Sequence, residues 1–326
     1  TNALGAACLA EVSGIRAHSP REDVVRITAT LRDTGADLVI ALGGGSVCDA
    51  TKAACLALAN DVCTVDDIDR IRVGNPVAPA TLRYISIPTT LSAGEYTAIA
   101  GVTDERIPRK EALIHPSLAP DVVILDAAMT VATPPRLYFG TGIRAVDHAV
   151  ETWCSINVTP LTEASSLHAL RILPQALAKS KADPDDLDTR LACLIGAWLS
   201  IQGVATGVDL GASHGIGHVL GGTAGMPHGE TSCVMLPHVL RYNNAVNGER
   251  QAILAAAMGD PDTSAADQIQ ALVASLDLPG RLRDAGVSKE ILPTIAEESM
   301  LDMWIPTNPR TIAGPQDVLP LLQAAW

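Results

Sequence analysis

Four histidines are the residues whose type and spacing point most directly to chemistry. His214 and His228 lie fourteen residues apart in one segment that also contains His218, and His148 lies far upstream in a stretch with a helical pattern. Imidazole nitrogens bind transition metals and exchange protons near neutral pH. Because these side chains come from separate elements, they could converge in an all-helical region. The sequence therefore predicts a metal or substrate pocket there.

A strand followed by a glycine run and a helix is the second chemical feature. The apolar run Asp37–Leu42 leads into Gly43, Gly44, Gly45 and Ser46, and a helical pattern then continues to about Ala59. Glycines let the backbone approach a pyrophosphate closely, and the unpaired N–H groups at a helix N-terminus attract it. The pattern predicts a dinucleotide-binding loop, with a simple tight turn as its alternative.

The chain has two regions with different sequence patterns. Residues 1–132 alternate helical patterns with short apolar runs such as Tyr84–Ile87 and Val122–Leu125, whereas long Ala- and Leu-rich helical patterns follow from Pro134 onward. We therefore expect an α/β, Rossmann-like, dinucleotide-binding domain over residues 1–132. An all-α domain that carries the substrate or metal site is expected over residues 133–326.

Composition limits the classes of partner. The net charge is −13 and no run of Lys or Arg is present, so nucleic acid is not an expected partner. No apolar stretch reaches the ~20 residues of a membrane span. The seven cysteines are scattered, which suits reduced thiols in a cytosol. We expect a cytoplasmic homodimeric enzyme that acts on a small molecule.

Several motifs together resemble the iron-containing (group III) alcohol dehydrogenase family. They are the glycine loop with Asp49, the threonine-rich segment Pro88–Thr97 and the histidine segment Ser213–Thr231, and the likeness extends to Asn308–Arg310. The resemblance implies a Rossmann-like domain followed by a helical domain, an architecture shared with dehydroquinate synthase, with the active site in the cleft between them. It also implies a first strand and helix that precede Thr1 and are missing here.

The resemblance implies roles for individual residues. His148, His214 and His228 match metal ligands, and His218 matches a histidine beside the nicotinamide that does not bind the metal. Asn2 lies where an aspartate would repel a 2′-phosphate, so the choice between NAD(H) and NADP(H) stays open. Lys110 matches a lysine that reaches the cofactor ribose, or it is an ordinary surface lysine. The other cofactor contacts would come from Gly43, Gly44, Gly45, Ser46, Asp49, Thr89 and Thr90.

Arg144 departs from the family, which has an aspartate ligand four residues before the first histidine. A guanidinium about 4 Å from a divalent ion would repel it by about 8 kcal/mol at an effective dielectric of about 20, and arginine does not deprotonate to escape this. Asp147 could replace the ligand, but it lies about 100° around the helix from His148. We therefore expect no Fe or Zn, with metal binding by the three histidines as the alternative.

The maleylacetate reductase branch of the family also lacks this aspartate and works without metal. The segment His218–Gly222, together with Glu230 and Thr231, resembles that branch. We expect an NAD(P)H-dependent reductase of an anionic oxo-acid, in which Arg144 pairs with a substrate carboxylate or a developing oxyanion and His218 donates a proton. The alternatives are a metal-dependent alcohol or aldehyde dehydrogenase, a lyase related to dehydroquinate synthase, and a nucleotide-binding protein without turnover.

Overall fold

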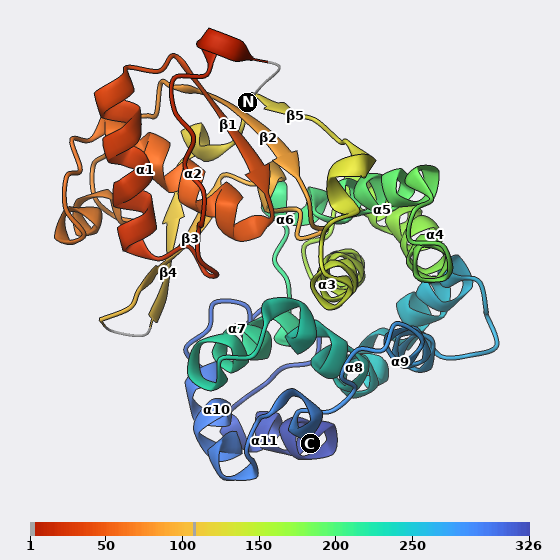
Figure 1. The fold of residues 1–326 in the computed structure, drawn as a ribbon. Coiled ribbons are helices and arrows are strands. Elements are labelled where there is room, and N and C mark those ends of the chain that lie inside the picture. The colour runs from red at the N-terminus through yellow and green to blue at the C-terminus, as the bar shows by residue number, and fades with distance from the viewer. Residues whose placement is uncertain (1–3, 107–108) are drawn as a thin grey trace. The chain divides into compact units, whose positions relative to one another are not determined.

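The computed structural model describes residues 4–106 and 109–326, which divide into two compact units (Figure 1). Unit 1 comprises Thr1–Thr89 and Ala93–Asp126, and unit 2 comprises Thr90–Ser92 and Ala127–Trp326. Asn2 lies outside the described residues, as do the side chains of Arg109 and Lys110. The predicted fold class, an α/β part followed by a helical part, is confirmed.

Unit 1 is built on a short parallel sheet with the order β1-β2-β5. Its strands are β1 (Leu38–Gly43), β2 (Arg83–Pro88) and β5 (Val122–Val123). Gly43 lies opposite Pro88 in the β1–β2 register, so the glycine loop and the threonine-rich segment both leave the sheet at the carboxyl ends of neighbouring strands. An antiparallel pair, β3 (Ile99–Asp104) and β4 (Arg109–Ile114), was not predicted from the sequence.

Helices α1 (Arg21–Thr34) and α2 (Gly45–Ala59) lie side by side in unit 1 (Figure 1). Val24, Ile27 and Leu31 of α1 are buried in one core with four alanines of α2, namely Ala50, Ala53, Ala54 and Ala57. The small alanine side chains let the two helices approach closely. Helix α1 ends at Thr34, and its C-cap Gly35 has a φ of 62°, a left-handed conformation that glycine adopts at little cost.

The two faces of the parallel sheet differ in how they are covered. Ala41 and Tyr84 are buried in one cluster with Cys48 of α2, because successive strand residues point to opposite faces and these point toward the helix. The alternate residues Ile40 and Leu42 are 41% and 52% exposed. An apolar face of this kind is unusual for a parallel sheet, since such sheets are normally covered on both sides.

Unit 2 is helical. Its longer helices are α3 (Pro135–Cys154), α4 (Pro160–Ala182), α5 (Leu187–Ser200), α7 (Ala212–Ala224), α8 (His228–Met258), α9 (Ala265–Ser275), α10 (Leu292–Ser299) and α11 (Pro315–Ala325), with the single turn α6 (Gln202–Ala205) before α7. A buried apolar cluster joins α7, α8, α10 and α11. Across the described ranges, no helix is both long and apolar enough to cross a membrane.

Candidate active site in the helical unit

Helix α3 carries four ionisable side chains within two turns. Arg144, Asp147, His148 and Glu151 are all buried, with exposed fractions of 8% or less. Their spacing of three and four residues places them along one side of the helix. Helices α8 and α3 approach closely at Gly229 and Gly140. A Cβ atom on Gly229 would lie only 2.4 Å from the Gly140 carbonyl carbon, so only glycine fits there. This glycine contact brings the first turn of α8, which begins at His228, against α3.

Glu151 organises the N-terminus of helix α7. Its carboxylate accepts hydrogen bonds from the backbone N–H groups of Gly211 (3.1 Å), Ser213 (2.9 Å) and His214 (3.2 Å). The N-cap residue Gly211 has no side chain to do this, and a Cβ there would lie 3.0 Å from Glu151 Oε1. The first-turn N–H groups of a helix need acceptors and favour negative charge. Glu151 therefore caps α7 from another helix.

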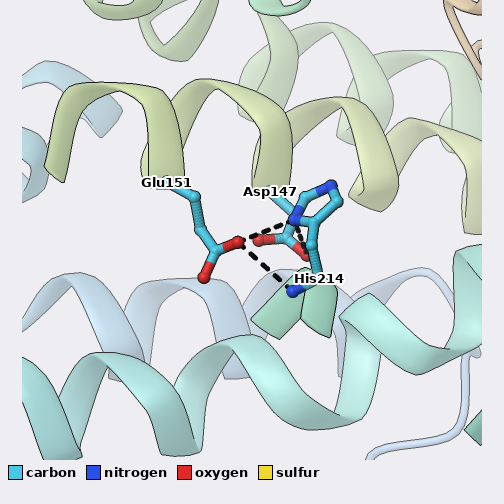
Figure 2. A group of neighbouring side chains, drawn as sticks. All are labelled: Asp147, Glu151 and His214. Atoms are coloured by element: carbon cyan, nitrogen blue, oxygen red, sulfur yellow. Dashed lines mark hydrogen bonds and ion pairs between the residues drawn. The ribbon is translucent and has the colours of Figure 1, made fainter. Parts of the chain in front are cut away.

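The same carboxylate orients the imidazole of His214, as Figure 2 shows. His214 Nδ1 lies 2.8 Å from Glu151 Oε2 and 3.5 Å from Asp147 Oδ2. Burial and the neighbouring Asp147 raise the pKa of the Glu151 carboxyl to about 8, although the three backbone N–H groups oppose this shift. When Glu151 is ionised it only accepts, so Nδ1 donates and Nε2 keeps its lone pair. That Nε2 atom is buried and has no hydrogen-bond partner among the described residues. His214 thus presents a lone pair on the side away from Glu151.

The imidazoles of His148 and His214 stack with ring centroids 4.9 Å apart. Burial lowers the pKa of both rings well below the usual histidine value, and the positive charge of Arg144 lowers it further. Both rings are therefore neutral near pH 7. His148 Nδ1, like His214 Nε2, is buried without a hydrogen-bond partner in the described part of the chain.

Arg144 lies among these groups with few partners of its own. Its Nη1 donates to Ser232 Oγ on α8 (3.1 Å) and lies 4.0 Å from Asp147 Oδ2. Asp147 also accepts a hydrogen bond from Ser213 Oγ (2.8 Å). Burial lowers the pKa of Arg144, but a guanidinium keeps its charge in proteins. The site therefore contains a buried cation whose other N–H groups can bind an acceptor.

Two sets of donor groups in this region could bind a divalent ion. Ligand atoms of Asp147, Glu151 and His214 lie within 4.8 Å of one another, but Glu151 already accepts three backbone N–H groups and the His214 Nδ1 hydrogen. At the histidines, the neutral rings of His148 and His214 would suit an ion, yet the Arg144 charge acts on both. The residues present fit a divalent ion poorly, because a fixed positive charge stands beside every candidate ligand set.

His218 lies on helix α7, as His214 does, and belongs to a second group of contacts. Its Nδ1 lies 2.9 Å from Asp302 Oδ2, and its ring centroid is 5.1 Å from that of Trp304 and 5.8 Å from that of His228. The side chain of His218 is 35% exposed, in contrast to the buried His214. Asp302 and Trp304 were missed from the sequence, because no periodic pattern marks their segment; only its closeness to Asn308–Arg310 could have suggested a role.

The predicted cofactor residues of unit 1 lie in a strand, glycine loop and helix as expected. Gly43 ends β1, Gly44 is the N-cap of α2 and Gly45 begins the helix. The backbone N–H of Thr89 donates to the Gly43 carbonyl (3.0 Å), which ties the threonine-rich segment to the glycine loop. This geometry fits a phosphate-bearing cofactor, because helix α2 begins at the loop and the first N–H groups of a helix attract phosphate.

Three other predicted cofactor residues have contacts of their own. Ser46 Oγ accepts from the backbone N–H of His18, and Asp49 Oδ2 accepts from that of Gly101, so both also support the fold of unit 1. Thr90 belongs to unit 2, where its hydroxyl donates to Ser92. The backbone of Lys110 lies in β4 and its side chain is outside the described residues. Cofactor contact by these residues stays a prediction.

Glu230, which suggested the maleylacetate reductase branch, has a structural partner. Its carboxylate pairs with Arg136 of α3, and Glu230 is 3% exposed. Thr231 Oγ1 donates to the His228 carbonyl within α8. These contacts hold the first turn of α8, and with it His228, against α3.

An α/β unit with a glycine loop, joined to a helical unit with clustered histidines, defines a nucleotide-dependent enzyme of two parts. Family models for iron-containing alcohol dehydrogenases match residues 1–127 and, as the C-terminal part of that family, residues 139–326. The chain belongs to the iron-containing alcohol dehydrogenase family. It is an NAD(P)-dependent oxidoreductase, as the dehydrogenases and reductases among its relatives indicate.

Relatives named for different activities are similar to this chain over most of their length. The chain is 35% identical to dehydrogenase ALT3 of Alternaria alternata, covering 99% of this chain and 93% of the relative. It is 32% identical to lactaldehyde reductase of Escherichia coli K12, covering 90% and 78%. The structure of maleylacetate reductase from Rhizobium sp. strain MTP-10005 is similar with a TM-score of 0.80 at 30% identity, covering 97% and 81%.

Proposed function

We propose that this protein reduces an anionic oxo-acid with hydride from NADH or NADPH, and that it does so without a metal ion. The observation that carries the proposal is Arg144, a buried cation that donates one hydrogen bond, to Ser232, among the residues the structure describes. An arginine has five N–H donors in a planar fork that matches a carboxylate. A substrate carboxylate would satisfy the remaining donors.

Each group then has a part in the reaction. The bound nicotinamide would supply the hydride that adds to the carbonyl carbon, and the C=O electron pair moves to oxygen. His218 gives its proton to that oxygen, and the ring later regains a proton from water. Arg144 holds the substrate carboxylate, while Glu151 keeps helix α7 and its histidines in place. Hydride and proton together convert the oxo group to a hydroxyl.

The likeness to maleylacetate reductase supports an oxo-acid as substrate. That relative and this chain share 30% identity over most of both chains. The chain is also similar to a lactaldehyde reductase, whose name specifies an aldehyde substrate. A small-molecule aldehyde is the competing substrate class.

The test compares an oxo-acid with its neutral methyl ester. Arg144→Met should lower the preference for the acid, measured as the ratio of kcat/KM values, by about tenfold to a hundredfold, because losing one charge-assisted contact costs about 1.5–3 kcal/mol. Arg171→Met, which removes an exposed arginine from α4 of the same unit, is the matched control and should leave the ratio unchanged. Equal preference in wild type and Arg144→Met would mean that Arg144 does not contact the substrate.

A second candidate function is a metal-dependent alcohol or aldehyde dehydrogenase. It is favoured by the two buried ring nitrogens without hydrogen-bond partners, His148 Nδ1 and His214 Nε2, because metal ligands need such lone pairs. Elemental analysis of the purified protein separates the two candidates. One equivalent of Fe or Zn, lost together with activity on chelation, would favour this second function.

A further inference from the structure

The ring of His218 is held by a short segment that follows α10, residues 302–305. Asp302 Oδ2 lies 2.9 Å from His218 Nδ1. Asp302 is itself fixed, because its other carboxylate oxygen accepts the backbone N–H of Trp304 at 2.9 Å and the side chain is only 12% exposed. One oxygen is thus committed to its own segment and the other is directed at the imidazole.

Helix α7 accommodates this segment by lacking a side chain at Gly215. A Cβ atom there would lie 3.0 Å from Ile305 Cδ1 and 3.1 Å from Asp302 Oδ1, which is tighter than normal contact. Gly215 lies three residues before His218, so both are on the same side of the helix. The glycine therefore allows Asp302 to reach the imidazole.

Trp304 restrains the same imidazole from another direction. Its ring centroid lies 5.1 Å from that of His218, with the planes tilted by 36°, and 5.6 Å from that of His214. Aromatic contacts of this kind restrict how the smaller ring can turn. Asp302 and Trp304 thus both contact the His218 ring, and the Asp302 carboxylate faces its Nδ1 atom.

We propose that Asp302 is a positioning residue that keeps hydrogen on His218 Nδ1, so that Nε2 is the nitrogen that exchanges a proton with the substrate. An ionised carboxylate only accepts, so Nδ1 must donate. This inference rests on the proposed function in one respect, the role of His218 as proton donor: Nε2–H breaks, the substrate O–H forms, and the electron pair of the N–H bond stays on the ring.

The direct test is nitrogen NMR of the protein with ¹⁵N-labelled histidine, which reports which ring nitrogen carries hydrogen. Wild-type His218 should be protonated on Nδ1, and Asp302→Ala should give a mixture of the two tautomers. Asp302→Asn, whose amide oxygen can still accept from Nδ1, should largely restore the wild-type spectrum. Glu298→Ala is the matched control, because it removes a different carboxylate that bonds α7 through Thr223, and it should leave the His218 signals unchanged.

Kinetics give a second readout. Asp302→Ala should lower kcat for the oxo-acid by about tenfold to a hundredfold, the usual effect of losing a partner that orients a histidine, with KM changed less than about threefold. In a protein that already carries His218→Ala, the Asp302→Ala change should have no further effect on kcat, because the two residues act as a unit.

The outcomes distinguish this inference from the proposed function. A wild-type His218 protonated on Nε2, or a spectrum that Asp302→Ala leaves unchanged, would overturn the positioning role whatever the reaction is. Unchanged kcat in His218→Ala alone would remove His218 as proton donor and with it the catalytic part of the inference. A normal tautomer shift combined with additive kinetic effects would also contradict it, because Asp302 would then act independently of His218.

Discussion

Lys52 of unit 1 and Arg144 of unit 2 are both buried cations, but they have different surroundings. Lys52 in unit 1 is fully buried, and its ammonium donates to the carbonyl oxygens of Gly94 (2.6 Å), Thr97 (2.6 Å) and Ile99 (3.0 Å). Arg144 in unit 2 donates one hydrogen bond to a neutral hydroxyl among the described residues, and its nearest carboxylate oxygen is 4.0 Å away. Lysine has three N–H donors, all used, whereas Arg144 has five and uses one of them in a hydrogen bond within the described residues.

This difference separates a structural cation from one suited to a ligand. Lys52 joins helix α2 to residues 94–99, so all of its N–H donors are used in holding the fold together. Burying a charge without enough partners is costly, and a protein keeps such a group only where the missing partner arrives later or the charge itself acts. The comparison therefore supports ligand binding by Arg144 and a purely structural role for Lys52.

The largest expected effect concerns metal affinity. Arg144→Asp replaces the repelling charge with an anionic ligand beside His148, His214 and His228, so zinc affinity should rise by at least about a thousandfold. Titration calorimetry with zinc measures it, on protein whose fold is checked by circular dichroism. Arg144→Asn, which removes the charge without adding a ligand, should give a smaller gain. Stoichiometric zinc or iron already present in the wild-type protein would contradict the comparison.

The next effect concerns Lys52, whose N–H donors are all hydrogen-bonded. Lys52→Met leaves buried carbonyl oxygens of Gly94, Thr97 and Ile99 without their donor, and each unsatisfied buried group costs about 1–3 kcal/mol. We expect unit 1 to lose about 3–5 kcal/mol of unfolding free energy, measured by urea denaturation. Lys179→Met, at an exposed position of α4, is the control. A loss below about 1 kcal/mol would show that Lys52 is not structurally required.

A pH-dependent effect of intermediate size concerns Glu95, a carboxyl group buried in the same unit as Lys52. Burial raises the pKa of Glu95 to about 7, and Asp49 contributes, although Lys52 opposes the shift. The pKa is higher in the folded than in the unfolded chain, so the stabilisation is complete below about pH 4.5 and is lost as pH rises through 7. Glu95→Gln should therefore be more stable than wild type at pH 8, by up to about 3 kcal/mol, with the difference vanishing near pH 4.5. Denaturant unfolding at the two pH values measures it; a pH-independent difference would argue against an ionising Glu95.

The smallest effect concerns the stability that Arg144 itself contributes. The double change Arg144→Met and Asp147→Asn removes both charges, and buried ion pairs replaced by neutral groups usually change stability little or favourably. We expect unfolding free energy within about 1 kcal/mol of wild type, although the preference for acids is lost. Destabilisation as large as that of Lys52→Met would mean that Arg144 is also a structural cation.

Much of the fold could be read from local patterns. The apolar run Asp37–Leu42 and the glycines after it predicted β1 and the start of α2 to within one residue. The hairpin of β3 and β4 was not predicted, because Gly101 interrupts one strand and charged residues begin the other. Such strands form only because each pairs with the other, and that pairing leaves a weak trace in sequence.

The sequence by itself determined which residues of unit 2 are chemically capable: the histidines, and an arginine in place of an expected aspartate. Spacing along a helix also placed Arg144 and His148 on one face. Only the tertiary structure decided which partners these groups have. Glu151 caps α7 and orients His214 from a different helix, and Asp302 reaches His218 from 84 residues away. The reason is physical: a hydrogen bond requires two groups within about 3 Å, and the folding of the whole unit, rather than any local pattern, brings such distant residues together.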